Sequence, residues 1–233
     1  TIAAFDHDTL KLMQEDVRKP VMVLPAGVVT ANMYQDFHPG KMYTAASDTS
    51  RGTGNDDAIT VILDTKTGYV VADIQNNLIP PDQLALASMA LLSRYHNPVW
   101  AIEDNDAGIL TIASAQAARY PSLYYRESEK PGWHTDERNR WLLWGELIEA
   151  VNARLVTVPS EDGLAQFYSV IRNPEKDGRI EGATGAHDDY PMAVGIACQM
   201  RRYARPVGRG PLKGIDDSWG NIMRRSSLSR SRW

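Results

Sequence analysis

The chain from residue 41 onward opens with apolar runs separated by polar turns. The stretches 41–48 and 58–64 are rich in small and β-branched residues, and the turn Asp64–Gly68 leads into a third such stretch, 69–74. Runs of this length that end in Gly and polar residues are typical of β-strands. Because the connections are short, the pattern predicts three antiparallel strands in a meander.

Helical and strand patterns alternate after Pro80-Pro81. Apolar residues recur there at helical spacing, and shorter apolar runs fall between these segments. The expected helices run from after Pro81 to about 96, and over about 106–119, 135–151, 160–171 and 188–203, with expected strands at 99–102, 122–126 and 155–158. This alternation predicts an α/β fold in which helices cover both faces of a mixed sheet.

The segment 1–40 is irregular, with an expected short helix at 8–17 and several prolines. We expect a linker or an arm packed on the core, because prolines interrupt regular structure. The main domain is then expected at 41–203 and a flexible basic tail at 204–233. A chain that begins at Thr1 suggests a piece excised from a longer protein.

Composition narrows the class of protein. Hydrophobic residues make up 43% of the chain, and no apolar run is as long as a membrane span. The N-terminus lacks the basic start and apolar block of a secretory signal. Cys198 is the single cysteine, so no internal disulfide can form and an intracellular, reducing setting is expected. We interpret it as a small hydrophobe in an apolar helix.

Charge is distributed unevenly along the chain. Residues 201–233 contain nine basic and two acidic residues, a net charge of +7, which leaves −11 for residues 1–200 out of the formal −4. An acidic body attracts metal ions, and a basic tail suits a polyanion. The tail could equally serve only to keep the protein soluble.

Acidic residues lie at the ends of three segments that are far apart in the sequence. Asp48 ends the first strand of the meander, Glu103 follows the strand 99–102, and Asp188 and Asp189 precede the last helix. Like charges within a few ångströms raise each other's pKa, so such acids need compensation if the fold brings them together. A divalent cation is the simplest compensation, and carboxylates are ligands that Mg²⁺ and Mn²⁺ prefer.

Four motifs, in this order, resemble the C-terminal nuclease domain of the large terminase subunit of tailed bacteriophages. They are an Asp at the first strand end, Glu-x-Asn after the fourth strand, Gly-Trp-x-Thr before a long helix, and Gly-x-His-Asp-Asp before the last helix. The resemblance covers about residues 40–203. It implies an RNase H-like α/β fold, in which an antiparallel three-strand meander is followed by parallel strands.

The same resemblance implies an endonuclease that uses two Mg²⁺ or Mn²⁺ ions to cut concatemeric double-stranded DNA during genome packaging. Asp48 would bridge both ions, Glu103 would hold one, and Asp188 or Asp189 the other. Two divalent ions about 4 Å apart suit an in-line displacement at phosphorus. One of the two acids could cap the helix while the other reaches the metal. We favour Asp189 as the ligand.

Several neighbouring residues have two interpretations each. His187 could orient a water or contact the scissile phosphate, or it could be structural. Asp56 and Asp57 could support the metal from an outer shell, or they could be part of a solvated turn. Asn105 could contact DNA or an outer-shell water, whereas Asp106 is expected to be the N-cap of the next helix.

Cations in the acidic body are candidates for contacts with DNA phosphates, which position a duplex without reading its sequence. The candidates are Lys66, Arg126, Lys130, Arg138, Arg140, Lys176 and Arg179. The polar stretch 173–184 could be a flap that controls access to the site.

The resemblance also implies partners. These are an N-terminal packaging ATPase domain, absent here, the portal protein and the small terminase subunit, all in the host cytoplasm and without a membrane. The chain lacks the Gly-x-x-x-x-Gly-Lys-Ser/Thr motif of such an ATPase. Two alternatives remain open: a resolvase-like, structure-specific nuclease, and a non-catalytic module that docks the motor to the portal.

Overall fold

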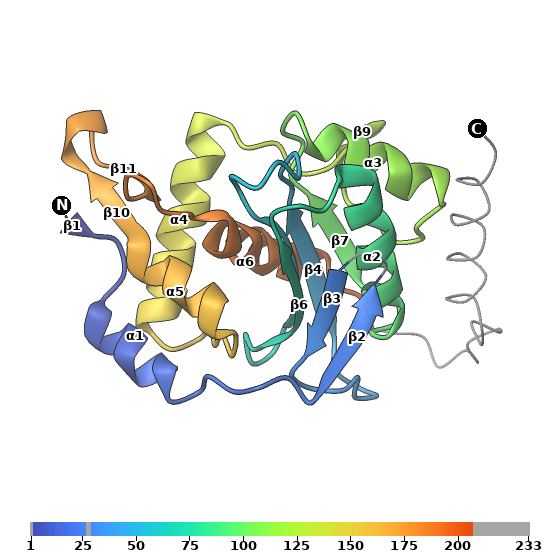
Figure 1. The fold of residues 1–233 in the computed structure, drawn as a ribbon, viewed down its shortest axis with the longest axis horizontal. Coiled ribbons are helices and arrows are strands. Elements are labelled where there is room, and N and C mark those ends of the chain that lie inside the picture. Colours follow the sequence, from blue (N-terminus) through green and yellow to red (C-terminus); the bar gives the residue numbers. More distant parts are fainter. Residues whose placement is uncertain (1, 27–28, 207–233) are drawn as a thin grey trace.

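A six-stranded sheet forms the centre of the computed structural model, which describes residues 2–26 and 29–206 (Figure 1). Its strand order is β2-β3-β6-β5-β4-β7. The strands are β2 Met22–Ala26, β3 Val29–Met33, β4 Tyr43–Asp48, β5 Ala58–Asp64, β6 Val70–Asn76 and β7 Val99–Ile102. Strand β7 pairs parallel with β4, and the other neighbours in the described sheet pair antiparallel. The expected mixed sheet and its antiparallel meander are confirmed.

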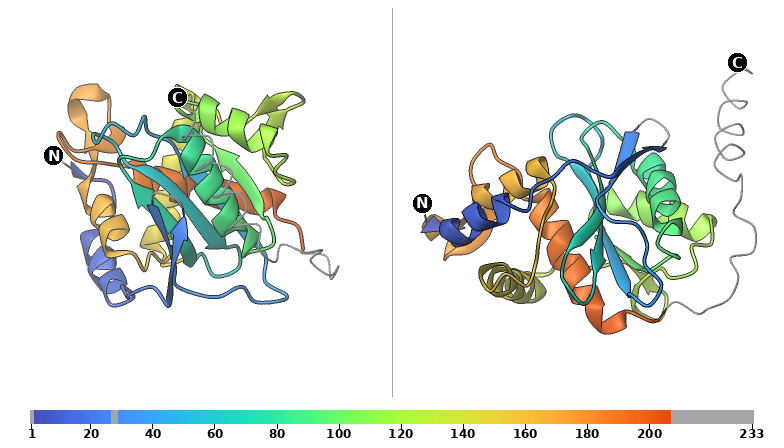
Figure 2. Two further views of the ribbon diagram at one scale, coloured as in Figure 1. Left: turned by 45° about the vertical axis from the view of Figure 1, so that its right-hand side comes forward. Right: turned by 90° about the horizontal axis from the view of Figure 1, so that it is seen from below.

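Helices cover both faces of this sheet (Figures 1 and 2). They are α1 His7–Gln14, α2 Pro81–Ser93, α3 Gly108–Ala117, α4 Glu137–Asn152, α5 Glu161–Ser169 and α6 Asp189–Gln199. Helices α1, α4, α5 and α6 lie on one side and α2 and α3 on the other. None of the helices in the described ranges has both the length and the apolar character needed to cross a bilayer.

Smaller elements surround this core. A second sheet has the order β1-β10-β11, and β8 pairs with β9 in a third. These elements are β1 Ile2–Ala3, β8 Tyr125–Glu127, β9 Lys130–Pro131, β10 Val170–Asn173 and β11 Arg179–Gly182, with short 3-10 helices at Pro174–Lys176 and Met200–Tyr203. The polar stretch expected at 173–184 is therefore mostly the turn and second strand of the β10–β11 hairpin.

The central strands are buried on both faces because each face packs on helices. In β5, Ile59 and Val61 belong to the cluster beneath α6, whereas Ile62 belongs to the cluster beneath α2. A strand buried on both faces is a nearly continuous apolar run rather than an alternating one. This explains why 58–64 was recognisable from the sequence alone.

Three segments differ from the sequence analysis. Residues 22–26 and 29–33, assigned to the arm, form the paired strands β2 and β3 at the sheet edge. Pro25 is tolerated there because β2 has a neighbour on one side only. The expected strand 155–158 is reduced to a single bridge between Tyr69 and Thr157. The expected strand 122–126 is replaced by the shorter β8.

Two further expectations concern the C-terminal part of the chain. Cys198 is partly buried against a hydrophobic cluster, which agrees with its interpretation as a small hydrophobe. Residues 207–233 of the expected tail lie outside the described residues.

A buried carboxylate joins the sheet to α6. Asp73 on β6 accepts hydrogen bonds from Asn32 Nδ2 at 2.9 Å, from the Tyr34 hydroxyl at 3.3 Å and from the Tyr190 hydroxyl at 2.7 Å. Burial raises its pKa to about 6, although these donors oppose the shift. The network ties β3, β6 and α6 together at the cost of a buried ionisable group.

Asp73 should make the stability of the protein pH-dependent. Its folded pKa exceeds the unfolded value of about 3.9, so its contribution is fully present below pH ~4 and is lost as pH rises through about 6. The loss amounts to about 3 kcal/mol. Asp73→Asn cannot titrate at this position. The difference in free energy of unfolding between this variant and the wild type, measured by urea unfolding, should therefore shift in favour of the variant as the pH rises from about 4.5 to about 7.5. Asp82→Asn, in the first turn of α2, is the control. Parallel pH profiles of Asp73→Asn and wild type would contradict this account.

Candidate active site

Asp48 and Glu103 lie side by side at the ends of two parallel strands. Residue Ser47 of β4 is in register with Ile102 of β7, and the Glu103 N–H donates to the Ser47 carbonyl at 2.9 Å. Both acidic residues are only 9% exposed. Strand ends fixed by sheet hydrogen bonds hold these two carboxylates on a rigid base.

Helix α6 brings two more acids to the same edge. The Thr44 hydroxyl donates to the Ala197 carbonyl at 2.9 Å, which aligns the start of β4 with the end of α6. The strand spans about 13 Å from Thr44 to Asp48. The helix spans about 12 Å from Ala197 back to Asp189. Asp188 and Asp189 therefore reach the level of Asp48, as the sequence analysis expected.

Burial and nearby acids disfavour the charged forms of Asp48, Asp188 and Asp189. Burial raises the pKa of Asp48 well above its usual range, and the charges of Glu103, Asp189 and Asp188 raise it further. Burial also raises the pKa of Asp189 to about 7, opposed by a hydrogen bond from the Asp57 backbone. The pKa of Asp188 is raised by burial, with the Arg140 guanidinium acting in the opposite direction.

Asn105 is the neutral donor between the first two acids. Its Nδ2 lies 3.2 Å from Glu103 Oε2 and 3.5 Å from Asp48 Oδ1. Its Oδ1 accepts from the Gly108 N–H at 2.7 Å at the start of α3. The expectation that Asp106 caps this helix is wrong, because Asn105 satisfies the helix N–H while Asp106 pairs with Arg51 at 2.9 Å.

Thr135 holds the other side of Glu103. The loop before α4 pairs with β7 through a bridge between Glu103 and Trp133, and the Thr135 hydroxyl donates to Glu103 Oε1. Thr135 is not the cap of α4, because Asp136 is the N-cap and forms a capping box with Asn139. The Thr135 hydroxyl faces Glu103 instead, a role that sequence reasoning missed although it noticed the Gly-Trp-x-Thr loop.

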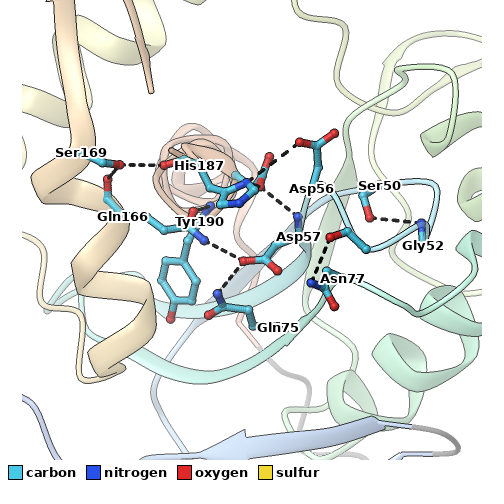
Figure 3. Close-up of polar contacts among 12 residues, drawn as sticks. Ser50, Gly52, Asp56, Asp57, Gln75, Asn77, Gln166, Ser169, His187 and Tyr190 are labelled. Atoms are coloured by element: carbon cyan, nitrogen blue, oxygen red, sulfur yellow. Dashed lines mark hydrogen bonds and ion pairs between the residues drawn. The ribbon is translucent and has the colours of Figure 1, made fainter. Parts of the chain in front are cut away.

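A second set of contacts surrounds Asp189, and Figure 3 shows three of the residues that take part, Asp56, Asp57 and His187. The Asp57 N–H donates to Asp189 Oδ2 at 3.1 Å, and His187 Nδ1 lies 3.4 Å from the same oxygen and 4.0 Å from Asp56 Oδ1. The Asp57 carboxylate turns away, because its Oδ2 accepts from Gln75 at 2.7 Å and from Gln166 at 2.9 Å. Asp57 thus supports Asp189 through its backbone, and both glutamines were missed by sequence reasoning.

Asp188 and Asp189 have different partners. Asp188 Oδ2 lies 3.5 Å from an Arg140 nitrogen. Asp188 occupies the N-cap position of α6, yet its side chain makes no capping hydrogen bond among the described residues. The expectation that one of the two acids caps the helix is therefore not met. Asp189 is supported by neutral backbone and by His187, whereas Asp188 faces a permanent cation, and this difference favours Asp189 as the better metal ligand.

The candidate DNA-contacting cations fall into two groups. Arg140, Lys176 and Arg179 line a cleft of about 600 Å³ between α4 and the β10–β11 turn, together with Thr135 and Trp141. Arg138 lies nearby in the first turn of α4. Within the hairpin, Lys176 and Arg179 both pair with Glu181, at 2.8 and 3.5 Å. The second group lies outside this cleft, where Arg126 pairs with Asp104 and Lys130 with Glu127.

Lys66 does not lie with the other cations. It follows Asp64, which pairs with Tyr43 at the start of β4, whereas Asp48 pairs with Ile59 at the other end. Lys66 is therefore at the opposite end of the sheet from the four acids.

The residues at this edge fit a hard divalent cation by their chemistry. The atoms that would coordinate the cation are carboxylate oxygens, which Mg²⁺ and Mn²⁺ prefer as ligands. The hydroxyl oxygen of Thr49, next to Asp48, is buried and has no hydrogen-bond partner in the part of the chain that is described. As placed, no three His, Cys, Asp or Glu side chains in residues 2–26 and 29–206 are grouped closely enough to hold an ion. Rotation of the acidic side chains would be needed to bring three of them within reach of one ion.

Comparisons with known proteins establish the fold. No protein-family model matches the sequence, and no curated protein matches it either. Among solved structures, the large terminase nuclease of thermophilic phage G20c, with bound magnesium, aligns with a TM-score of 0.64 at 15% identity, over 85% of this chain and 97% of that one. The nuclease domain of the large terminase of Thermus phage P74-26 aligns with a TM-score of 0.60 at 18% identity, over 85% and 95%.

A nuclease domain from a virus outside the phages has a similar fold. The human cytomegalovirus terminase nuclease domain, soaked with manganese and bound to an inhibitor, aligns with a TM-score of 0.51 at 13% identity, over 85% of this chain and 95% of that one. The fold expected from the four motifs is thereby confirmed.

Replacing Asp48 with Asn should stabilise the protein when no divalent ion is present. An Asp whose folded pKa is raised lowers stability above its unfolded pKa, and Asn removes this charge from its acidic neighbours. We expect the free energy of unfolding in EDTA at pH 8 to rise by about 1 kcal/mol, a size typical of single stabilising changes. Urea unfolding measures it.

The control for this substitution is Asp104→Asn. The Asp104 carboxylate pairs with Arg126 and with His134, so its replacement should lower stability. A loss of stability in Asp48→Asn as large as that in Asp104→Asn would refute the view that the acidic edge is repulsive.

Proposed function

We propose that this chain is a metal-dependent endonuclease domain that hydrolyses phosphodiester bonds in concatemeric double-stranded viral DNA during genome packaging. The observation that carries the proposal is the convergence of Asp48, Glu103, Asp188 and Asp189 at one edge of the sheet. The likeness in fold to large terminase nucleases supports it.

Asp48 is the central ligand in this proposal. It lies beside Glu103 in the sheet, and Asp189 contributes to its raised pKa from the other side. Asp48 would bridge two Mg²⁺ or Mn²⁺ ions, with Glu103 on one and Asp189, assisted by Asp188, on the other. Such ions, when bound, lower the pKa of an attacking water and neutralise charge on the phosphate.

The neighbouring residues of the chain orient these ligands. Asn105 and Thr135 donate to the two oxygens of Glu103, and the Asp57 N–H donates to Asp189. These neutral hydrogen bonds orient the carboxylates, and each carboxylate oxygen keeps a second lone pair for a ligand. His187 lies beside Asp189 and its side chain is 42% exposed, so its other ring nitrogen, Nε2, would hold a water or a phosphate oxygen.

The substrate enters along the cleft between α4 and the β10–β11 turn. Arg140, Lys176 and Arg179 line this cleft and would contact backbone phosphates, which gives binding without sequence preference. In this proposal the domain works in the host cytoplasm with a packaging ATPase domain, the portal and the small terminase subunit. These partners would bring DNA to a body whose own charge is acidic.

Plasmid cleavage tests the proposed activity. The wild type should cut with Mn²⁺ or Mg²⁺ and fail in EDTA. Asp48→Asn and Glu103→Gln should each lower the rate by more than about 100-fold, beyond the 10- to 100-fold typical of outer-shell changes. Asp82→Asn, outside the site, should cut normally.

The same assay separates the alternatives. Equal cutting of linear duplex and branched junctions supports the packaging nuclease, whereas preference for junctions supports a resolvase-like enzyme. A folded wild type that cuts nothing with any ion, but binds DNA or portal protein, would support a docking module and overturn the nuclease.

The cleft cations should contribute to DNA binding as phosphate contacts. Lys176→Ala with Arg179→Ala should reduce the slope of log affinity against log salt by about 2, since each lost phosphate contact lowers it by about 0.9. Fluorescence anisotropy of a labelled duplex in Ca²⁺ measures this slope. Lys66→Ala, at the opposite end of the sheet, should leave the slope unchanged. An equal change in both variants would show that the cleft does not bind the duplex.

A further inference from the structure

A buried glutamine on α5 uses both ends of its amide near the acidic edge (Figure 3). Gln166 is 8% exposed. Its Nε2 donates to Asp57 Oδ2 at 2.9 Å, and its Oε1 accepts from the Tyr190 N–H at 2.8 Å. One side chain thus links the loop after β4 to the first turn of α6.

Both contacts of Gln166 lead to Asp189. The residue that its Nε2 holds, Asp57, donates its own backbone N–H to Asp189 Oδ2 at 3.1 Å. The N–H that its Oε1 receives belongs to Tyr190, the residue directly after Asp189. The Gln166 amide therefore restrains Asp189 in two ways. Its Nε2 fixes the residue that donates to the Asp189 side chain, and its Oε1 fixes the backbone next to Asp189.

The close approach of α5 to α6 makes this arrangement possible. A Cβ on Gly163 would come within 2.5 Å of the Tyr190 ring, so only glycine allows the two helices to pack at this distance. Ser169, on the same helix as Gln166, donates its hydroxyl to the His187 carbonyl at 2.9 Å. Helix α5 thus holds the segment around Asp189 at several points.

We propose that Gln166 is a positioning residue that sets the orientation of Asp189 for binding a divalent cation. The inference rests on the proposed function, because it assigns Gln166 a role at the same site. An amide is suited to this task, since it donates to a carboxylate and accepts from a helix N–H at the same time. Outer-shell partners of this kind typically change metal affinity by 10- to 100-fold when removed.

The first test compares two glutamines on the intact chain. Gln166→Leu should weaken Mn²⁺ binding by about tenfold, measured by titration calorimetry without DNA. Gln199→Leu is the matched control, because Gln199 is also buried, at 3% exposed, but contacts Glu146 and Arg202. Gln199→Leu should leave Mn²⁺ affinity unchanged, and thermal unfolding should show that both variants fold.

The second test exchanges the polarity of the contact with Asp57. Gln166→Glu places a carboxylate against the Asp57 carboxylate and should weaken Mn²⁺ binding, whereas Gln166→Glu with Asp57→Asn restores a donor and an acceptor. Recovery of Mn²⁺ affinity in the double variant would not follow from a merely structural role. No recovery would refute the proposed contact between Gln166 and Asp57.

Cleavage kinetics separate this proposal from the nuclease itself. In Gln166→Leu the Mn²⁺ concentration for half-maximal cleavage should rise about tenfold, while kcat at saturating Mn²⁺ stays near that of the wild type. A wild type that binds Mn²⁺ and cuts DNA, beside a Gln166→Leu variant with unchanged affinity, would overturn this inference alone. A wild type that neither binds Mn²⁺ nor cuts would overturn both.

Discussion

Burial of several like-charged carboxylates at one end of the sheet is the constraint on which the rest of the structure depends. Asp48 and Glu103 are each 9% exposed, and burial and mutual repulsion both raise the pKa of Asp48. A folded domain is stable by only about 5–15 kcal/mol, so this arrangement has to be offset by packing elsewhere. The two hydrophobic clusters on the faces of the sheet provide that packing. A cation bound only to the folded state would add stability through mass action, so ligand binding and folding are coupled at this edge.

The elements that hold the acids are the most rigid ones available. Strands β4 and β7 are hydrogen-bonded in register, and α6 is anchored along β4 by the Thr44 hydroxyl. Loops contribute only supporting contacts, from Asp57 on one side and Thr135 on the other. A division of this kind keeps the ligands within a narrow range of positions and leaves the surrounding loops free to accommodate a substrate.

Much of the fold and of the acidic set could be predicted from the sequence, for physical reasons. Strand β5 is buried on both faces, so it is a continuous apolar run, and the acids lie at the ends of β4 and β7 and at the start of α6. The β2–β3 hairpin was missed because the edge strand β2 tolerates Pro25 and exposes three of its five residues. Thr135 and Gln166 were missed because their partners, Glu103 and Tyr190, are 32 and 24 residues away. Side-chain contacts over such separations leave no periodic signal in a single sequence.

The chemistry of the supporting groups follows from the same constraint. A lysine or arginine beside Asp48 or Asp189 would offset their repulsion, but it would also compete with a divalent cation for the same oxygens. Asn105, Gln166 and the Asp57 N–H avoid this conflict, because neutral donors orient a carboxylate without cancelling its charge. Arg140 is the exception among the described contacts, and it faces Asp188 at 3.5 Å rather than Asp189. Burial and repulsion disfavour the ionised forms of Asp48 and Asp189, and a divalent cation bound there would be the positive charge that favours them.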